Sequence, residues 1–213
     1  RGPTKTFAQA CHTLSGLGRL ARAIGVPVLP TVNIANQRDI EARAREFNWP
    51  VVLKPHASKE GKAHVHLCES LRDACRVLPE VLANSHDSRA VVEPYSPGQE
   101  YAFFSLWSGS NEIQRCVLSD TSHLGPRGVT TSGYVATQSP NSLDGVLQQI
   151  RHYLSRTGAF GTHAFTLRLQ PQGPILTEVG YGVSGDDVLE SGLLGSDAQN
   201  WLDAELDVLL GMV

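Results

Sequence analysis

Apolar residues in the first quarter of the chain recur at helical and then at extended spacing. In residues 5–25 they stand three or four positions apart, which predicts one amphipathic helix that ends at Gly25. A short extended run follows at 27–32, and a charged segment with inward apolar residues predicts a second helix at 37–47. The apolar run at 51–55 then predicts a buried strand with a lysine near its end.

A polar stretch separates this strand from the next one. Residues 56–62 include Gly61, and residues 63–68 alternate apolar and polar side chains, so the pattern predicts a hairpin with a mobile tip. A helix is expected to begin after Ser70, because a serine followed three residues later by an aspartate approximates a capping box. Pro79 lies inside this helical pattern, and we expect it to kink or shorten the helix.

The second half of the chain is richer in strand patterns. Strands are expected at 90–95, 100–107 and 112–118, with a hairpin turn at 108–111. The polar stretch at 119–141 is long for a loop inside a compact domain, and loops of that length are usually functional or disordered.

Two helices and two strands complete the pattern. The helices are expected at 143–154 and 197–210, and the strands at 161–169 and 174–179. Helices mixed with antiparallel hairpins in this order favour an α+β fold in two lobes.

Composition and net charge argue against several classes of function. The 213 residues, of which 41% are apolar and 18% charged, are enough for a core that needs neither disulfides nor metals. The formal net charge of −3 indicates neither a nucleic-acid partner nor an anionic membrane. No apolar run reaches the roughly 18 residues of a membrane span, and the start lacks a signal-peptide pattern. We therefore expect a cytoplasmic protein.

The four cysteines are Cys11, Cys68, Cys75 and Cys116. They lie in apolar stretches, with no CxxC pair and no histidine–cysteine cluster at metal-ligand spacing. This usage indicates free buried thiols in a reducing compartment.

Three segments, in order, resemble the ATP-grasp superfamily. They are Val-Val-Leu-Lys-Pro at 51–55 before a glycine-bearing hairpin, Val-Val-Glu-Pro-Tyr at 91–95 followed by Gly-Gln-Glu at 98–100, and Gly-Pro-Ile-Leu-Thr-Glu-Val at 173–179. Within the superfamily the chain is most similar to carboxylate–amine ligases that build dipeptides, such as carnosine synthase and the bacterial L-amino acid ligases. The run Gly-Val-Pro-Val-Leu-Pro at 25–30 adds to that similarity.

The resemblance implies an ATP-grasp fold, in which a nucleotide lies between two α+β lobes. The module would span residues 1–213, with a smaller lobe at about 26–95 that carries the phosphate-binding hairpin and a larger lobe at about 96–213 that carries the metal-site strands. Most such ligases have a further amino-terminal domain, which we expect to be absent here. Because the chain begins with Arg1 rather than methionine, we expect a fragment, a processed product or a chain without its first domain.

The resemblance also implies the phosphate contacts. Lys54 takes the position of the lysine that binds the α- and β-phosphates, and Lys5 is a second candidate near the opening helix. The loop at 57–61 would close over the phosphates, with Lys59 or Lys62 adding positive potential. The structural alternatives are an exposed strand end for Lys54 and an ordinary surface hairpin for the loop lysines.

The nucleoside would be held by the next segment. Glu93, Tyr95 and Ser96 resemble the hinge that reads the adenine edge, with Glu93 near the exocyclic amine. Glu100 matches the carboxylate that accepts hydrogen bonds from the ribose hydroxyls, which suits a group with several acceptor sites and no donor. Pro94 departs from the usual pattern because it removes one backbone N–H. The alternative is that both glutamates are exposed charges at strand ends.

The metal-binding segment departs from the pattern of the superfamily. Glu178 keeps the first position of the usual Glu-x-Asn-x-Arg segment, whereas Gly180 replaces the asparagine and Gly182 the arginine. Phe165 stands where we expect the acid of the preceding strand. Magnesium needs oxygen ligands, so we expect a depleted Mg²⁺ site, to which the aspartates at 186–187 could contribute.

Two further residues are catalytic candidates by resemblance. His163 matches a histidine of the dipeptide-forming branch, and its alternative is a partly buried strand histidine bonded to a neighbouring carbonyl. Arg127, in the long loop, could approach a substrate carboxylate, or it could be a solvated arginine.

The sequence thus predicts an ATP-dependent carboxylate–amine ligase that works through an acyl phosphate, with ATP and Mg²⁺ as cofactors. A small amino acid or carboxylate would be its substrate, and a missing amino-terminal domain or a homodimer would complete it. The alternatives are a catalytically degenerate ATP-grasp module that acts as a nucleotide-binding or scaffold domain, and a plain interaction domain. The sequence does not identify the two substrates.

Overall fold

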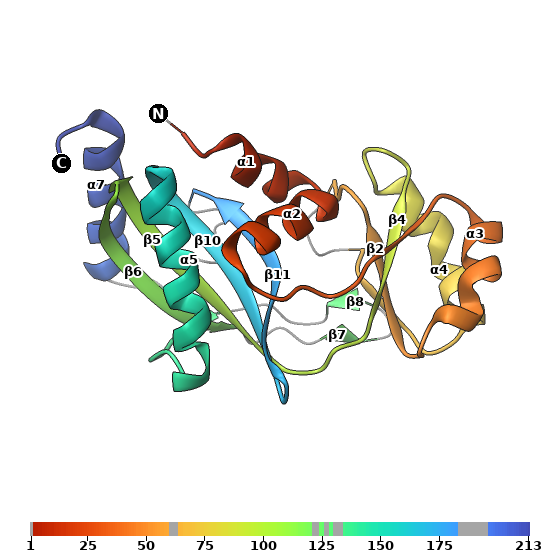
Figure 1. Cartoon of the computed structure of the whole chain (residues 1–213). Coiled ribbons are helices and arrows are strands. Elements are labelled where there is room, and N and C mark those ends of the chain that lie inside the picture. The colour runs from red at the N-terminus through yellow and green to blue at the C-terminus, as the bar shows by residue number, and fades with distance from the viewer. Residues whose placement is uncertain (1, 60–63, 121–123, 126–127, 130–133, 183–195) are drawn as a thin grey trace. The chain divides into compact units, whose positions relative to one another are not determined.

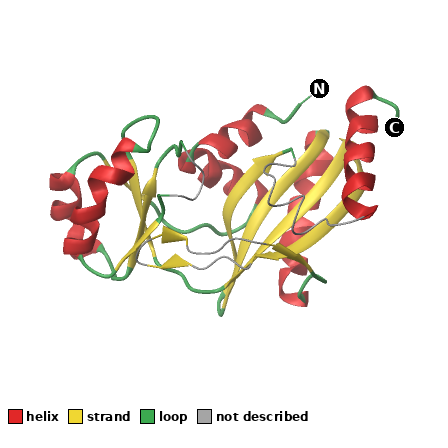
Figure 2. Cartoon of the chain, turned by 180° about the vertical axis from the view of Figure 1, so that it is seen from behind, coloured by secondary structure: helices red, strands yellow, loops and turns green. Residues whose placement is uncertain are grey.

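The computed structural model describes residues 2–59, 64–120, 124–125, 128–129, 134–182 and 196–213. The chain forms two compact units, each with its own antiparallel sheet and helices (Figures 1 and 2). The large unit comprises Arg1–Val28, Gly98–Thr121 and Gly133–Val213, and the small unit Leu29–Pro97 and Ser122–Ser132. The predicted α+β class is confirmed.

The small unit is built on a four-stranded sheet with strand order β1-β4-β2-β3. Its elements are β1 (Val32–Ile34), α3 (Gln37–Arg43), the 3-10 turn η1 (Ala44–Glu46), β2 (Val51–Pro55), β3 (His66–Cys68), α4 (Leu71–Ala83) and β4 (Ala90–Pro94). The two-residue strands β7 (Leu124–Gly125) and β8 (Gly128–Val129) pair with each other.

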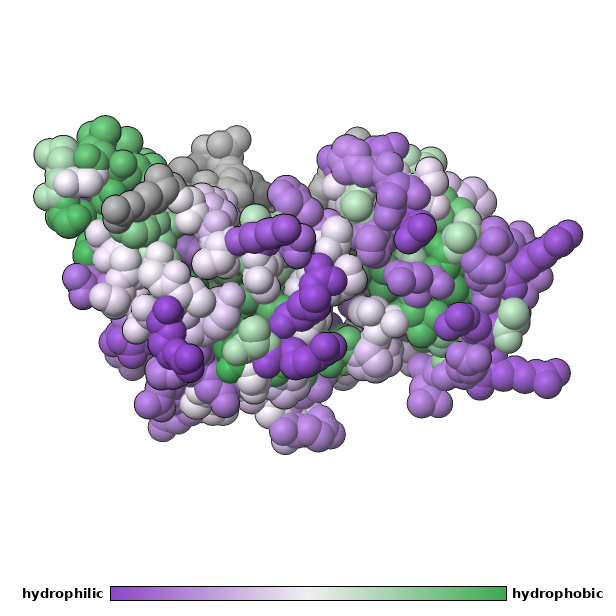
Figure 3. Space-filling view, turned by 45° about the horizontal axis from the view of Figure 1, so that its top comes forward, coloured by the Kyte–Doolittle hydropathy of each residue, from purple (hydrophilic) through white to green (hydrophobic). Residues whose placement is uncertain are grey.

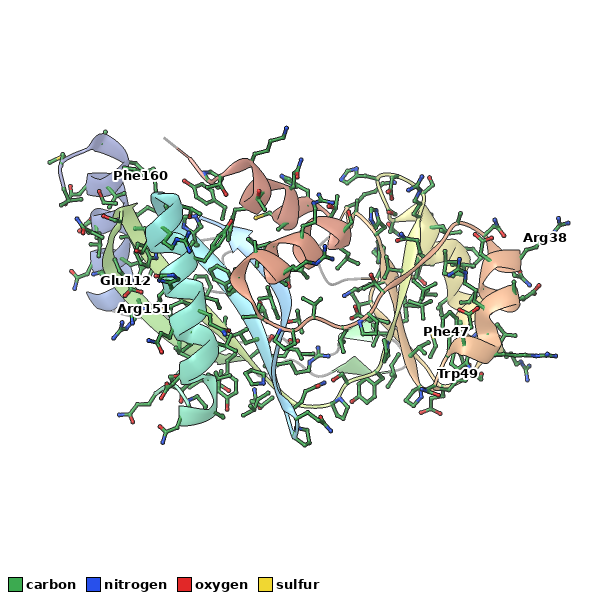
Figure 4. All side chains as sticks on the ribbon, in the orientation of Figure 1. Arg38, Phe47, Trp49, Glu112, Arg151 and Phe160 are labelled. Carbon is green, nitrogen blue, oxygen red and sulfur yellow. The ribbon has the colours of Figure 1, made fainter. Side chains whose placement is uncertain are left out.

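The two faces of this sheet differ in character. One face packs against α3 and α4, and its core includes Val51, Leu53 and Val92 (Figure 1). The ring of Phe47 meets that of Trp49 edge-on, 6.0 Å between centroids, beside the same core (Figure 4). Because side chains alternate along a strand, residues 52 and 54 of β2 lie on the opposite face.

Helix α4 begins as predicted and continues through its proline. The Ser70 side chain accepts a hydrogen bond from the Asp73 backbone N–H at 3.2 Å, which caps the helix. Pro79 does not end α4, so the predicted shortening is wrong. The proline ring lies on the exposed side, whereas Leu78 and Val81 are buried on the sheet side, and their burial holds the last turn in place.

The large unit is built on a five-stranded sheet with strand order β11-β10-β5-β6-β9. Its elements are α1 (Lys5–His12), α2 (Leu14–Ile24), β5 (Gln99–Gly109), β6 (Asn111–Asp120), β9 (Tyr134–Ala136), the 3-10 turn η2 (Asn141–Leu143), α5 (Asp144–Thr157), β10 (Ala159–Gln170), β11 (Gly173–Tyr181) and α7 (Ser196–Leu210). Part of the predicted long loop at 119–141 is therefore strand.

Helices cover both faces of the large sheet. The main core joins α1, α2 and α5 to one face and includes Leu20, Phe103 and Phe165. A smaller core joins Trp201 of α7 to Phe104 on the other face. Figures 1 and 2 show α5 and α7 on opposite sides of the strands.

A partly buried charge network fastens α5 to the sheet. Arg151 of α5 donates from Nε to Oε2 of Glu112 on β6 at 2.7 Å, and the Ser105 hydroxyl donates to the other oxygen of Glu112 at 2.8 Å (Figure 4). These partners satisfy a largely buried carboxylate, so the network serves the fold.

The opening helix predicted for 5–25 is two helices. Thr13 ends α1 and caps α2, because its hydroxyl accepts a hydrogen bond from the Gly16 N–H at 3.1 Å. A Cβ atom at Gly16 would lie 2.3 Å from the Gln9 carbonyl oxygen, so only glycine permits this close crossing. The predicted end at Gly25 is confirmed, with φ at 89°.

Exposed apolar side chains gather at the C-terminal end of α7. They belong to Leu206, Leu209, Leu210, Met212 and Val213, and Figure 3 shows this patch at the upper left. No helix among the described residues is both long and apolar enough to cross a membrane.

Candidate functional site

A lysine–glutamate pair occupies the face of the small sheet that α3 and α4 do not cover. Lys54 on β2 and Glu93 on β4 are diagonal neighbours, because Lys54 pairs with Val91 and Val52 with Glu93. Lys54 Nζ donates to Glu93 Oε1 at 2.8 Å, and the two side chains are 18% and 11% exposed. Lys54 is therefore not the exposed strand end of the structural alternative.

The pair supplies complementary polar groups at one place. A lysine ammonium has three donor hydrogens, of which the contact with Glu93 uses one. The Glu93 carboxylate has further lone pairs that can accept from a ligand. A ligand with an anionic group beside Lys54 and a hydrogen-bond donor beside Glu93 would therefore be stabilised, because both side chains are largely shielded from water.

The segment after β4 presents carbonyl groups more readily than N–H groups. Pro94 has no N–H, and the Tyr95 N–H donates to the Pro50 carbonyl at 3.1 Å within the small unit. Ser96 is buried. If the segment at 94–96 binds adenine as expected, it has to do so chiefly through its backbone carbonyl oxygens, which accept hydrogen bonds.

Glu100 lies in a polar cluster on the large sheet. It pairs directly with Arg168 across β5 and β10, and Arg168 Nη2 lies 2.5 Å from Glu100 Oε1. The Thr177 hydroxyl of β11 lies 3.4 Å from the same oxygen. Sequence reasoning missed Arg168 and Thr177, and only the order of the three strands brings them beside Glu100.

The strand register corrects the expected position of the missing acid. Phe165 is fully buried in the main core beside α1, on the face opposite Arg168 and Glu100. Glu178 pairs with Thr166, the next residue of β10. The strand alternation therefore places Thr166, not Phe165, on the Glu178 side, so the residue of β10 that faces Glu178 is a threonine.

The described residues around Glu178 do not fit a magnesium ion. Glu178 is exposed and lies opposite Thr166, and the next pair on the same face of the sheet, two pairs farther on, is Gly180 opposite Ala164. One carboxylate and one hydroxyl fall short of the oxygen ligands that octahedral Mg²⁺ requires. The aspartates at 186–187 lie outside the described residues, as does Arg127.

The other lysines considered for phosphate binding are exposed or lie outside the described residues. Lys5 is exposed in the first turn of α1. Lys59 donates from Nζ to the Ala83 carbonyl at 2.7 Å, where it caps the end of α4. Lys62 lies outside the described residues.

Cys11 of α1 lies near Glu178. Burial and, to a smaller extent, the Glu178 carboxylate raise the pKa of the Cys11 thiol to about 11. The thiol is therefore protonated at neutral pH and is a poor nucleophile, as expected for a free buried cysteine.

His163 lies in the core of the large unit. It is 1% exposed, its Nδ1–H donates to the Gly161 carbonyl at 3.1 Å, and its ring contacts Phe7 at 4.6 Å between centroids. Burial lowers the pKa of His163 to about 4. These contacts match the structural alternative, a strand histidine bonded to a neighbouring carbonyl, and favour it over a catalytic role.

A neutral buried histidine makes stability depend on pH. The unfolded chain binds a proton at His163 below about pH 6.5, whereas the folded chain does so only near pH 4. The free energy of unfolding should therefore fall by about 2 kcal/mol between pH 7.5 and pH 5. Urea unfolding of the parent chain and of His163→Leu at both values tests this, since the variant should lose less stability. Equal losses would contradict the assignment.

Comparisons with known proteins test the fold of the chain. A scan against protein-family models finds no match. Phosphoribosylamine–glycine ligase of Synechocystis sp. is 25% identical over 198 residues, which cover 92% of this chain and 43% of that protein. The chain thus spans less than half the length of this relative.

Solved structures show the same fold at low sequence identity. The L-amino acid ligase of Bacillus licheniformis has a TM-score of 0.66 and 18% identity over 84% of this chain and 42% of that one. The biotin carboxylase domain of Hydrogenobacter thermophilus 2-oxoglutarate carboxylase, solved with MgADP and bicarbonate, has a TM-score of 0.73 and 15% identity over 99% of this chain and 48% of that one. Their common architecture is the ATP-grasp fold, and this chain has that fold.

Proposed function

We propose that this chain is the nucleotide-binding part of an ATP-dependent ligase that joins a carboxylate to an amine. The observation that carries the proposal is the largely buried Lys54–Glu93 pair on the face of the small sheet opposite α3 and α4, in a chain with the ATP-grasp fold. The names of two similar proteins, an L-amino acid ligase and a phosphoribosylamine–glycine ligase, support the reaction class.

Each polar group then has a part in binding ATP. Lys54 holds the α- and β-phosphates, and Glu93 accepts a hydrogen bond from the exocyclic amine of adenine. The backbone carbonyls of the segment at 94–96 face the same edge of the base. Glu100, positioned by Arg168 and Thr177, accepts hydrogen bonds from the ribose hydroxyls.

The reaction would proceed in two steps. A carboxylate oxygen attacks the γ-phosphorus of ATP, the bond to the β,γ-bridging oxygen breaks, and ADP leaves. An amine then attacks the acyl carbon of the acyl phosphate, and the C–O bond breaks to release phosphate while nitrogen loses a proton. Lys54 would stabilise negative charge on the phosphates during the first step.

A second candidate function follows from the metal strands. Glu178 has Thr166 opposite it and Gly180 two positions on, so the usual oxygen ligands are missing from this part of the chain. This favours a catalytically degenerate module that binds nucleotide without transferring phosphate. A further domain or a second copy would then supply the rest of an active ligase.

Calorimetry with a non-hydrolysable ATP analogue separates these candidates. For an active ligase we expect binding that depends on Mg²⁺ and a loss of the magnesium-dependent part in Glu178→Gln, whereas for the degenerate module we expect binding that Mg²⁺ does not change. Glu46→Gln, which changes an exposed carboxylate of the small unit, is the matched control and should bind like the parent.

Each outcome of these experiments bears on one of the two candidate functions. Magnesium-dependent binding of the analogue, together with release of ADP from ATP itself in a separate assay with amino acid pairs, supports the ligase. Equal binding in Mg²⁺ and in EDTA, without ADP release, supports the degenerate module. An absence of binding at millimolar nucleotide would overturn both.

A further inference from the structure

Two histidines and a glutamate converge on the helix-covered face of the small sheet. His64 Nδ1 lies 2.8 Å from Glu80 Oε1, and His66 Nε2 lies 3.3 Å from the same oxygen. The three ligand atoms all lie within 4.8 Å of one another. The sequence pattern missed this cluster, because it contains no cysteine and Glu80 follows the histidines only after the intervening β3 and most of α4.

Strand β3 and helix α4 hold two of the three residues in place. His66 is the first residue of β3, His64 lies in the turn two residues before it, and both imidazoles reach the same Glu80 oxygen. His66 pairs with Leu53, which faces α4, and Glu80 lies in the last turns of α4. The cluster therefore lies on the opposite face of the sheet from Lys54 and is separate from the proposed nucleotide site.

We propose that His64, His66 and Glu80 bind a divalent transition metal of the zinc class. Two imidazole nitrogens and one carboxylate oxygen are a known set of three protein ligands for zinc, with a fourth position open to water. In a tetrahedral site with bonds of about 2.1 Å, ligand atoms lie about 3.4 Å apart. The distances of 2.8 and 3.3 Å to Glu80 Oε1 are near that value, and the two imidazole nitrogens lie no more than 4.8 Å apart.

Exposure of the three side chains suits such a site. His66 is 8% exposed and His64 18%, whereas the Glu80 side chain is 49% exposed and can move to widen the short contact. Imidazole favours zinc, copper and nickel over magnesium and calcium, so the site differs in metal preference from a nucleotide site.

The surroundings of His66 limit the expected affinity. Its Nδ1 is buried and has no hydrogen-bond partner among the described residues. A hydrogen-bond partner on the second nitrogen of a metal-binding histidine typically changes metal affinity 10–100-fold. We therefore expect a dissociation constant on the order of micromolar for zinc rather than nanomolar.

Bound metal would join β3 to α4. Because the unfolded chain does not hold the three residues together, the ion stabilises the folded small unit by mass action. Zinc should thus raise the unfolding temperature without any nucleotide present.

Titration of the untagged, nucleotide-free 213-residue chain with Zn²⁺, and with Co²⁺ monitored by visible absorption, tests the proposal. We expect one site per chain and the intense absorption of tetrahedral Co²⁺. His64→Ala and Glu80→Gln should each weaken binding by at least about 10-fold, because each removes one of three ligands.

A matched control comes from the same unit. His56 contacts Asp87 at 2.7 Å, and no third ligand group joins them among the described residues, so His56→Ala removes a histidine–carboxylate pair but should leave Zn²⁺ affinity unchanged. Circular dichroism of each variant confirms that it is folded before the titration. The proposal is overturned if the parent binds no Zn²⁺ at 100-fold the expected constant (roughly 100 micromolar), or if folded His64→Ala and Glu80→Gln bind as the parent does.

Discussion

Replacement of Phe165 by aspartate is expected to unfold the large unit, whereas the same replacement at Thr166 is expected to leave it folded. Phe165 is fully buried and its ring contacts Phe7 at 5.5 Å and Phe103 at 6.4 Å between centroids. Loss of a buried phenyl group costs about 3–5 kcal/mol, and an unpaired carboxylate in the same core costs more. Their sum approaches the whole stability of a typical domain, about 5–15 kcal/mol.

Urea unfolding followed by circular dichroism checks this prediction. Thr166 is half-buried on the other face of β10, opposite Glu178, so Thr166→Asp adds a carboxylate at a place that solvent reaches. We expect it to unfold near the parent midpoint. A folded Phe165→Asp, or an unfolded Thr166→Asp, would show that the register of β10 and β11 is wrong.

The second large effect is expected at Lys54. Lys54→Met keeps most of the side-chain stem but removes the charge, and we expect nucleotide affinity to fall by about 10–100-fold, the value of a charge-assisted hydrogen bond to phosphate. The variant also leaves Glu93 without its cation, so its unfolding midpoint should fall as well.

Lys59→Met is the matched control for nucleotide binding. It removes a lysine from the same unit whose ammonium contacts the Ala83 carbonyl at the end of α4. Calorimetry with the ATP analogue should show parent-like affinity for Lys59→Met. If Lys54→Met binds as tightly as the parent, Lys54 does not contact the phosphates.

Local patterns were enough to predict most elements of both sheets. The apolar run at 51–55 and the Ser-Gly-Ser-Asn turn at 108–111 correspond to β2 and to the hairpin of β5 and β6. Each rests on short-range chemistry, namely burial of a strand and the backbone freedom of Gly109, whose φ is 68°. The predictions failed at Thr13 and Pro79, where contacts with another helix or with the sheet outweigh local preference.

The candidate site was only partly accessible from the sequence. Lys54, Glu93, Glu100 and Glu178 are candidates because a resemblance marks single positions in order along the chain. Arg168 and Thr177 were missed, since their relevance depends on which strands are neighbours. The expectation that Phe165 stands at the acid position was also wrong. Phe165 faces the core and Thr166 faces Glu178, because a shift of one residue along a strand moves a side chain to the opposite face of the sheet.

By itself, the sequence determined the α+β class, the order of the elements, and the presence of a lysine and three glutamates at positions typical of ATP-grasp ligases. The class and the order of elements follow from hydrophobic periodicity, which is local, and the four positions are implied by the resemblance of three short segments. Only the tertiary structure decided that Lys54 and Glu93 form a pair, that His163 is a core residue, and that His64, His66 and Glu80 converge. Those facts depend on contacts between residues far apart in the chain, and such contacts exist only once the sheets and helices have packed.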